Sequence, residues 1–178
     1  MTIRQFDRHT PQLEDRVFVD PSALVVGDVK IGADSSIWPM AVLRGDVHSI
    51  RIGARTSIQD GTVCHVTHAG PYDPEGHDLV IGDNVTVGHK AILHGCRISD
   101  NCLIGMGSVV MDDVRIHSGV VLGANSLVPP GRTLEGGFLW VGSPARKIRP
   151  LSEEEMAFFK YSADNYVRLK DRYLENLD

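Results

Sequence analysis

The chain has 178 residues, enough for one domain with a sizeable core. Its 18 Lys and Arg against 23 Asp and Glu give a net charge of −5, which predicts neither a nucleic acid partner nor attraction to an anionic membrane. The N-terminal residues lack the apolar run of a secretion signal, and no segment is long and apolar enough to span a membrane, so we expect a cytoplasmic protein with no membrane partner.

Aliphatic residues recur every six positions in four series, which cover residues 13–43, 52–64, 81–93 and 98–134. A small or β-branched residue stands two positions before most of them. Residues two apart on a strand face the same side, so both sets point inward. The pattern predicts an all-β solenoid over residues 1–150, a parallel β-helix of hexapeptide repeats with three repeats in each triangular coil. A sandwich of ordinary strands does not explain the strict spacing of six.

The three cysteines are an odd and sparse set that argues against a disulfide framework, and all occupy inward positions: Cys64, Cys96 and Cys102. We therefore expect small core residues there. Grouping the aliphatic positions by threes gives the coils 31/37/43, 52/58/64, 81/87/93, 98/104/110 and 116/122/128. About three extra residues follow Arg44 and about eleven follow His65, which predicts two loops leaving the stack at the third corner.

Residues 151–178 differ from the repeats and predict one amphipathic helix. Ser152 and Glu155 have capping-box spacing, and Gly142, Pro144 and Pro150 end the coils before it. Apolar side chains recur at helical intervals at Met156, Phe159, Ala163, Tyr166, Val167, Leu169, Tyr173, Leu174 and Leu177. We expect this stripe to pack along an outer face of the solenoid; the alternative is a helix that binds a partner.

Two histidines stand at the third corner of adjacent coils, because His65 follows Cys64 and His94 follows Leu93. Stacked strands lie about 4.8 Å apart, so these two side chains can share one metal ion. His89 belongs to the second corner, roughly 15 Å away, which a zinc–nitrogen bond of about 2.1 Å does not reach. If three copies pack around a threefold axis, the second corner of one chain meets the third corner of the next. Singly, each histidine could instead be a solvated corner residue.

The same columns carry further polar residues. Arg44 stands one coil below His65, and Asp60 stands one coil below His89, with Gln59 beside it. An assembly that brings His89 to His65 and His94 also brings Asp60 toward Arg44, so we expect an interfacial ion pair that fixes the register.

Several motifs resemble one family: "RGD" at 44–46, "QDG" at 59–61, His65, "GHKAILHG" at 88–95 and "GSPARKIRPLSEEE" at 142–155. They are similar to the gamma-class carbonic anhydrase family of left-handed hexapeptide-repeat proteins, over nearly the whole chain. The left hand is implied by this resemblance alone, because most parallel crossovers are right-handed.

The resemblance implies a homotrimer that hydrates CO2 to bicarbonate reversibly, with one metal ion per interface. Residues matching His65 and His94 of one chain and His89 of the next would hold zinc, with iron or cobalt as alternatives. Residues matching Arg44, Asp46 and Asp60 would organise the interface, and one matching Gln59 would orient the reacting water or bicarbonate. A helical Tyr or Asn approaches the site in relatives, which makes Tyr161 and Asn165 candidates here.

The sequence departs from the best-studied active members, which carry two glutamates near the metal for proton export. Val47 stands at the first position and His68 near the second. His68 is therefore a candidate proton shuttle or else an ordinary surface residue, with His48 and His77 as weaker candidates, and we expect weak activity. Three alternatives stay open: an acyltransferase that uses a histidine base on CoA thioesters, a thioester hydrolase, and a non-catalytic metal-binding scaffold.

Overall fold

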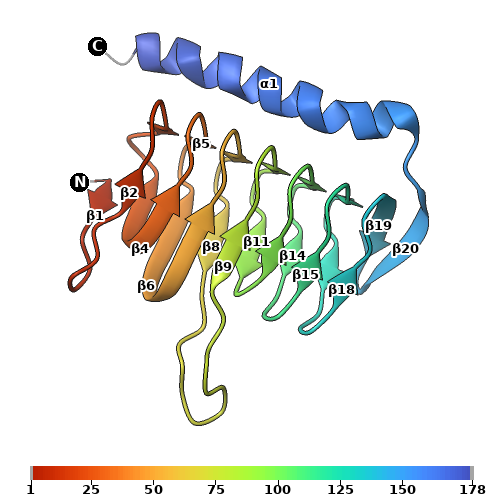
Figure 1. Cartoon of the computed structure of the whole chain (residues 1–178), viewed down its shortest axis with the longest axis horizontal. Coiled ribbons are helices and arrows are strands. Elements are labelled where there is room, and N and C mark those ends of the chain that lie inside the picture. Colours follow the sequence, from red (N-terminus) through yellow and green to blue (C-terminus); the bar gives the residue numbers. More distant parts are fainter. Residues whose placement is uncertain (1, 177–178) are drawn as a thin grey trace.

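The computed structural model describes residues 2–176, which form a parallel β-solenoid with one helix laid along it (Figure 1). The strands of the first coils are β1 Ile3–Arg4, β2 Gln12–Leu13, β3 Phe18–Val19, β4 Leu24–Ile31, β5 Ser36–Ile37, β6 Val42–Ile52, β7 Ser57–Ile58 and β8 Val63–His65. The middle coils contain β9 Leu79–Ile81, β10 Thr86–Val87, β11 Ile92–His94, β12 Arg97–Ile98, β13 Leu103–Ile104 and β14 Val109–Val110. The last are β15 Arg115–Ile116, β16 Val121–Leu122, β17 Leu127–Val128, β18 Thr133–Leu134, β19 Phe138–Gly142 and β20 Ala145–Pro150.

The strand register confirms the assignment of the coils. Residues at the first corner pair in the order Ile31, Ile52, Ile81, Ile98 and Ile116. At the second corner the order is Ile37, Ile58, Val87, Ile104 and Leu122. At the third it is Leu43, Cys64, Leu93, Val110 and Val128. All of these side chains are buried in one continuous core, so the predicted all-β solenoid is confirmed.

The first insertion is not the loop that the sequence suggested. Residues 45–50 belong to the long strand β6, which pairs with β4 and runs on through the third corner. Gly27 and Gly45 lie opposite each other there, and a Cβ atom on Gly27 would lie 2.3 Å from the carbonyl oxygen of Gly45. Two glycines therefore let both strands continue where other coils turn.

The second insertion does leave the stack. Residues 66–78 form a loop between β8 and β9 that projects from the solenoid (Figure 1). Its base is closed by an antiparallel pair of hydrogen bonds between Thr67 and His77. The predicted loop at this corner is confirmed.

The three cysteines are free and buried in the core, as expected. Burial raises the pKa of the Cys64 thiol to about 12 and that of the Cys102 thiol to about 11. Both groups are therefore protonated at neutral pH and act as small core residues.

The coils end in an antiparallel hairpin of β19 and β20, which turns at residues 142–145. Helix α1, Glu153–Glu175, then runs back along the solenoid over β10, β5 and β3 (Figure 1). Ser152 is its N-cap, and the capping box with Glu155 is present as predicted. No segment of the described helix is long and apolar enough to cross a membrane.

The helix packs on its own solenoid, as expected from its stripe. Phe159 and Ala163 are buried, whereas Met156, Tyr173 and Leu174 stay partly exposed; Leu177 lies outside the described residues. The ring of Tyr173 lies 5.4 Å from that of Phe18 and 5.2 Å from that of Trp38. Aromatic contacts of this kind join the end of the helix to the first coils.

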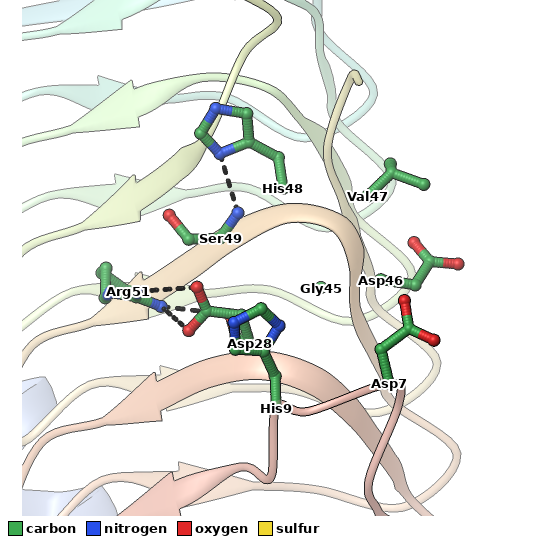
Figure 2. Close-up of a pocket in the computed structure, with 9 residues that line it drawn as sticks. All are labelled: Asp7, His9, Asp28, Gly45, Asp46, Val47, His48, Ser49 and Arg51. Carbon is green, nitrogen blue, oxygen red and sulfur yellow. Dashed lines mark hydrogen bonds and ion pairs between the residues drawn. The ribbon is translucent and has the colours of Figure 1, made fainter. Parts of the chain in front are cut away.

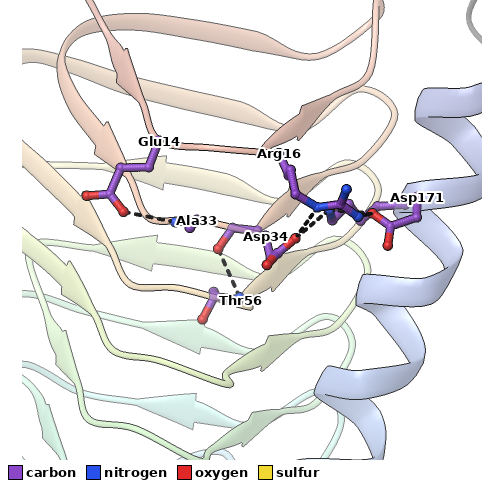
Figure 3. Close-up of polar contacts among 8 residues, drawn as sticks. Glu14, Arg16, Ala33, Asp34, Thr56 and Asp171 are labelled. Carbon is purple, nitrogen blue, oxygen red and sulfur yellow. Dashed lines mark hydrogen bonds and ion pairs between the residues drawn. The ribbon is translucent and has the colours of Figure 1, made fainter.

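One buried lysine, which the apolar pattern did not predict, also ties the helix to the coils. Lys170 is fully buried, and its Nζ lies 2.7 Å from Asp34 Oδ1 and 2.5 Å from Asp171 Oδ1. Arg16 completes this network by pairing with the same two aspartates (Figure 3). The lysine thus bridges a carboxylate of the solenoid and one of the helix.

Candidate metal centre

The predicted column at the third corner is present. His65 and His94 end the adjacent strands β8 and β11, and their Cα atoms are partners in the parallel register. Cys64 and Leu93, the residues just before them, point into the core. Side chains alternate along a strand, so the two imidazoles stand on the outer surface of the corner.

The two imidazoles face each other. His65 Nδ1 lies 3.0 Å from His94 Nε2, and the ring centroids are 5.0 Å apart. The remaining ring nitrogens each lie on a carboxylate: His65 Nε2 is 3.2 Å from Asp46 Oδ1, and His94 Nδ1 is 2.7 Å from Asp112 Oδ1. An ionised carboxylate can only accept, so each of these nitrogens carries the ring proton. The facing pair then presents two lone pairs to the same point.

The surroundings of His65 favour its neutral imidazole. Burial lowers the pKa of His65, and the positive charge of Arg44 lowers it further, against the opposing effect of Asp46. Burial would raise the pKa of Asp46, but hydrogen bonds from Arg44, at 2.6 Å, and from His65 outweigh it and hold the pKa below its usual range. A neutral His65 beside an ionised Asp46 is the state in which histidine binds metals.

Asp112 was missed by the sequence reasoning, because it lies one position away from the polar column of the third corner. It follows Val110, the third-corner aliphatic residue of the coil beyond His94, by two positions. Extending the column of His65 and His94 by one more coil reaches Met111, and Asp112 stands one position further along the chain. Thr67 Oγ1 also donates a hydrogen bond to Asp112, at 3.0 Å to Oδ2.

The predicted column at the second corner is present as well. His89 Nδ1 lies 2.9 Å from Asp60 Oδ2, and both side chains are about half exposed, at 47% and 48%. Arg44, the predicted partner of Asp60 across an interface, pairs within its own chain with Asp46. In residues 2–176 of this single chain, no group of three or more His, Cys, Asp or Glu side chains is placed to hold a metal ion.

The helix reaches the second-corner column through a tyrosine that we did not single out. Gln59 is only 5% exposed, and its Nε2 donates a hydrogen bond of 2.5 Å to Tyr166 Oη. Burial, with the nearby negative charge of Asp60, raises the pKa of Tyr166, so the phenol is neutral. Tyr161 and Asn165, the helical candidates, are both exposed, and the ring of Tyr161 packs 5.8 Å from that of Phe158. Tyr166 was hidden in the apolar stripe of the helix.

The proton-shuttle candidates occupy different surroundings. His68 is an exposed residue of the 66–78 loop, and His77 of the same loop pairs with Asp73 at 2.7 Å. His48 accepts a hydrogen bond from the Ser49 backbone, at 2.8 Å, and lines a cleft of about 380 Å³ (Figure 2). Val47 is 46% exposed and points away from His48.

Comparison with known proteins assigns the class of this fold. The "Bacterial transferase hexapeptide (six repeats)" family matches residues 95–130, and the "Hexapeptide repeat of succinyl-transferase" family matches residues 78–111. A crystal structure of a hexapeptide transferase family protein from Anaplasma phagocytophilum superimposes with a TM-score of 0.89, at 40% identity, over 97% of this chain and 98% of that one. The chain is thus a hexapeptide-repeat protein.

Three curated relatives narrow the class. Protein YrdA of Escherichia coli is 53% identical over 165 residues, 93% of this chain and 90% of that protein. Gamma carbonic anhydrase 1, mitochondrial, of Arabidopsis thaliana is 44% identical over 164 residues, 92% of this chain and 59% of that protein. A third relative, Gamma carbonic anhydrase 3, mitochondrial, of Arabidopsis thaliana, is 40% identical over 180 residues, 97% of this chain and 68% of that protein. The chain belongs to the gamma-class carbonic anhydrase family of hexapeptide-repeat proteins.

Proposed function

We propose that this protein is a metal-dependent carbonic anhydrase that hydrates CO2 to bicarbonate, slowly, at the subunit interfaces of a homotrimer. The observation that carries the proposal is the geometry of His65 and His94. Their facing nitrogens lie 3.0 Å apart while their other nitrogens contact Asp46 and Asp112. Two lone pairs this close repel unless a cation or a shared proton lies between them.

The donor set fits zinc. Two imidazoles, each fixed by a carboxylate on its far nitrogen, are a common arrangement around protein-bound zinc. Catalytic zinc sites have three protein ligands, so one more is required. We assign it to His89 of a neighbouring chain, whose Nδ1 contacts Asp60 in the same way. All three imidazoles would also accept iron or cobalt, and zinc is our first choice.

The surface beside these columns supports a second copy as the neighbour. Outward residues of β6, β8, β11, β14 and β17 form an aliphatic stripe of Val42, Val63, Ile92, Val109 and Leu127. Val63 and Ile92 are 38% and 43% exposed in the single chain. The stripe joins the second corner, which carries His89, to the third corner, which carries His65 and His94. An apolar surface between two halves of a site is suited to burial against identical chains.

Charged side chains would also fix the register of the subunits at this interface. In such a trimer Asp60 of one chain approaches Arg44 of the next, while Asp46 holds Arg44 within its own chain. Arg44 is about half exposed and projects from the same corner as His65. A guanidinium with two carboxylates around it would set the register of the subunits.

The chain's own residues position the reaction. His65 and His94 of one chain and His89 of the next would hold zinc, which would lower the pKa of a bound water to about 7 and supply hydroxide at neutral pH. Gln59 orients the reacting water or bicarbonate with its amide oxygen, because the amide nitrogen is engaged by Tyr166. Asp46 and Asp112 keep both histidines in one orientation. His68 carries protons away, since Val47 offers no carboxylate or other titratable group.

A second candidate is favoured by the comparisons. Both matching repeat families, and the solved structure from Anaplasma phagocytophilum, are described as transferases. An acyltransferase would use one histidine as a base and require no metal, while a thioester hydrolase would use the same metal centre. A non-catalytic metal-binding trimer is the remaining alternative.

The test is CO2 hydration by the zinc-loaded protein, followed by stopped flow at increasing imidazole concentration. We expect weak activity that rises with imidazole, because a diffusing base replaces a poor shuttle. His68→Ala should retain its metal, lose activity and recover part of it with imidazole. A trimer that contains zinc, hydrates no CO2 in any buffer and cleaves acyl thioesters would overturn the proposal in favour of the hydrolase.

A second experiment tests whether each metal site is shared between two chains. Chains carrying His89→Ala and chains carrying His65→Ala each lack one ligand, and mixing them should restore some intact sites. Metal content and activity of the refolded mixture should exceed those of either variant alone. A monomer with full metal content would contradict the shared site.

A further inference from the structure

We propose that Asp112 and Thr67 form a positioning pair for His94, which makes the base of the projecting 66–78 loop part of the metal centre. The inference rests on one part of the proposed function, namely that His94 binds a metal ion. The hydrogen bonds that carry it join side chains of this chain only.

The pair forms a continuous chain of contacts. His94 Nδ1 donates to Asp112 Oδ1 at 2.7 Å, and Thr67 Oγ1 donates to Asp112 Oδ2 at 3.0 Å. Each carboxylate oxygen therefore has a different partner, one on β11 and one in the loop. Hydrogen bonds to an ionised acceptor are short and strong, and two of them fix both the position and the rotation of the carboxylate.

The carboxylate decides which nitrogen of His94 is available. Ionised aspartate has no proton to donate, so His94 must carry its proton on Nδ1. The lone pair is then on Nε2, the nitrogen that faces His65. In the opposite tautomer a proton on Nε2 would point at His65 and exclude a cation. Asp112 thus holds His94 in the form that binds a metal.

Gly95 leaves the space that the contact between Asp112 and His94 requires. A Cβ atom at position 95 would lie 2.3 Å from Asp112 Oδ1 and 2.7 Å from His77 Cβ. Its φ of +50° is also one that other residues rarely adopt. Only glycine directly after His94 lets both the carboxylate and the returning end of the loop pack against this strand.

Thr67 is itself held firmly by the loop. Its backbone exchanges two hydrogen bonds of 3.0 Å with His77 across the base. Further along, Asp73 accepts from the Gly76 backbone, at 3.0 Å, and from His77 Nε2, at 2.7 Å. The loop is therefore an internally bonded hairpin, and a change in its base would move Thr67, then Asp112, then His94.

The experiment reads the tautomer of His94 directly, by nitrogen NMR of 15N-histidine-labelled protein without metal at a pH where imidazole is neutral. Wild-type protein and Thr67→Ser should show His94 protonated on Nδ1. Asp112→Ala should lose that preference, and Asp112→Asn should recover it because the amide oxygen still accepts. Thr67→Val should shift the population part of the way. Asp113→Asn, next in the chain and 53% exposed, is the matched control and should change nothing.

Zinc and cobalt affinity give the second readout. Asp112→Ala should bind about 10- to 100-fold more weakly, which is the usual effect of removing such a partner. Asp112→Asn and Thr67→Val should fall between it and the wild type. An unchanged tautomer and affinity in Asp112→Ala would overturn the inference, as would an Asn variant no better than Ala. If Asp112→Ala does not fold, the Thr67→Val and Thr67→Ser pair decides. A wild type that binds no metal refutes the proposed function, while the tautomer still tests the pair.

Discussion

Two outer faces of the same solenoid are covered in different ways. Under α1, the outward residues of β5, β7 and β10 are Ser36, Ser57 and Thr86, which are small and buried. On the aliphatic stripe, the equivalent outward residues include Val63 and Ile92, which are branched, apolar and exposed. The hexapeptide core is the same behind both.

The size and polarity of the outward side chains differ according to what covers each face. Small hydroxyl side chains leave room for a helix of the same chain, and Thr86 Oγ1 lies 2.8 Å from Ser162 Oγ of that helix. Branched apolar side chains gain most from burial against another surface. The first face is completed within the chain, and we infer that the second is completed by assembly.

The largest expected effect comes from placing a charge on the aliphatic stripe. Ile92→Glu should abolish association, because an unpaired carboxylate in an apolar interface cannot be solvated. Sedimentation or light scattering would show the monomer mass, and metal content should fall with it. Ile148→Glu is the control, since Ile148 is equally apolar and 54% exposed but lies on the terminal hairpin. A trimer in both variants would show that the stripe is not the interface.

Replacing Lys170 should destabilise the helix-covered face. Lys170→Met leaves Asp34 and Asp171 without their buried cation, and we expect a loss of about 2–3 kcal/mol in unfolding free energy; this is below the usual cost for a buried pair because the aspartates are about 30% exposed. Urea unfolding measures the loss. Lys160→Met is the control, because Lys160 is 79% exposed and should change stability by less than about 0.5 kcal/mol.

Much of this organisation could be predicted from the sequence. The spacing of six fixed the coils and their register, because a parallel solenoid repeats one short unit and each inward residue stacks on its counterpart. The columns of His65 with His94 and of Asp60 with His89 followed from the same count. Local periodicity determines these contacts, so periodicity was sufficient to find them.

The remainder depends on side-chain directions that spacing does not define. Tyr166 and Lys170 look like part of a helical pattern, yet one reaches Gln59 and the other is buried between aspartates. Asp112 contacts His94 only because Gly95 leaves space. The insertion after Arg44 was expected to be a loop, and is a strand because Gly27 and Gly45 pass close together. Each case requires a contact between coils that a linear count does not contain.

Acid should weaken the contact between the helix and the solenoid at Asp34. The hydrogen bond from Lys170 lowers the pKa of Asp34, as does that from Arg16, against the effect of burial. A carboxylate with a depressed pKa adds stability above its unfolded value of about 3.9, and that stability is lost as the pH falls through the folded value. Wild-type unfolding free energy should therefore drop below about pH 4 by more than that of Lys170→Met. Parallel curves for the two proteins would show that Asp34 does not depend on Lys170.

The smallest expected effect lies where the helix-covered face meets the candidate centre. Tyr166→Phe removes one hydrogen bond and keeps the ring beside Trp38, so stability should fall by about 1 kcal/mol. Gln59 then loses the partner that fixes its amide, and CO2 hydration should slow several-fold with metal content unchanged. Tyr161→Phe is the matched variant, because Tyr161 is exposed and pairs only with Phe158 among the ring contacts of the described chain. If Tyr161→Phe slows hydration and Tyr166→Phe does not, the tyrosine that acts at the centre comes from the outer face of a neighbour's helix, and the contact between Gln59 and Tyr166 only supports the fold.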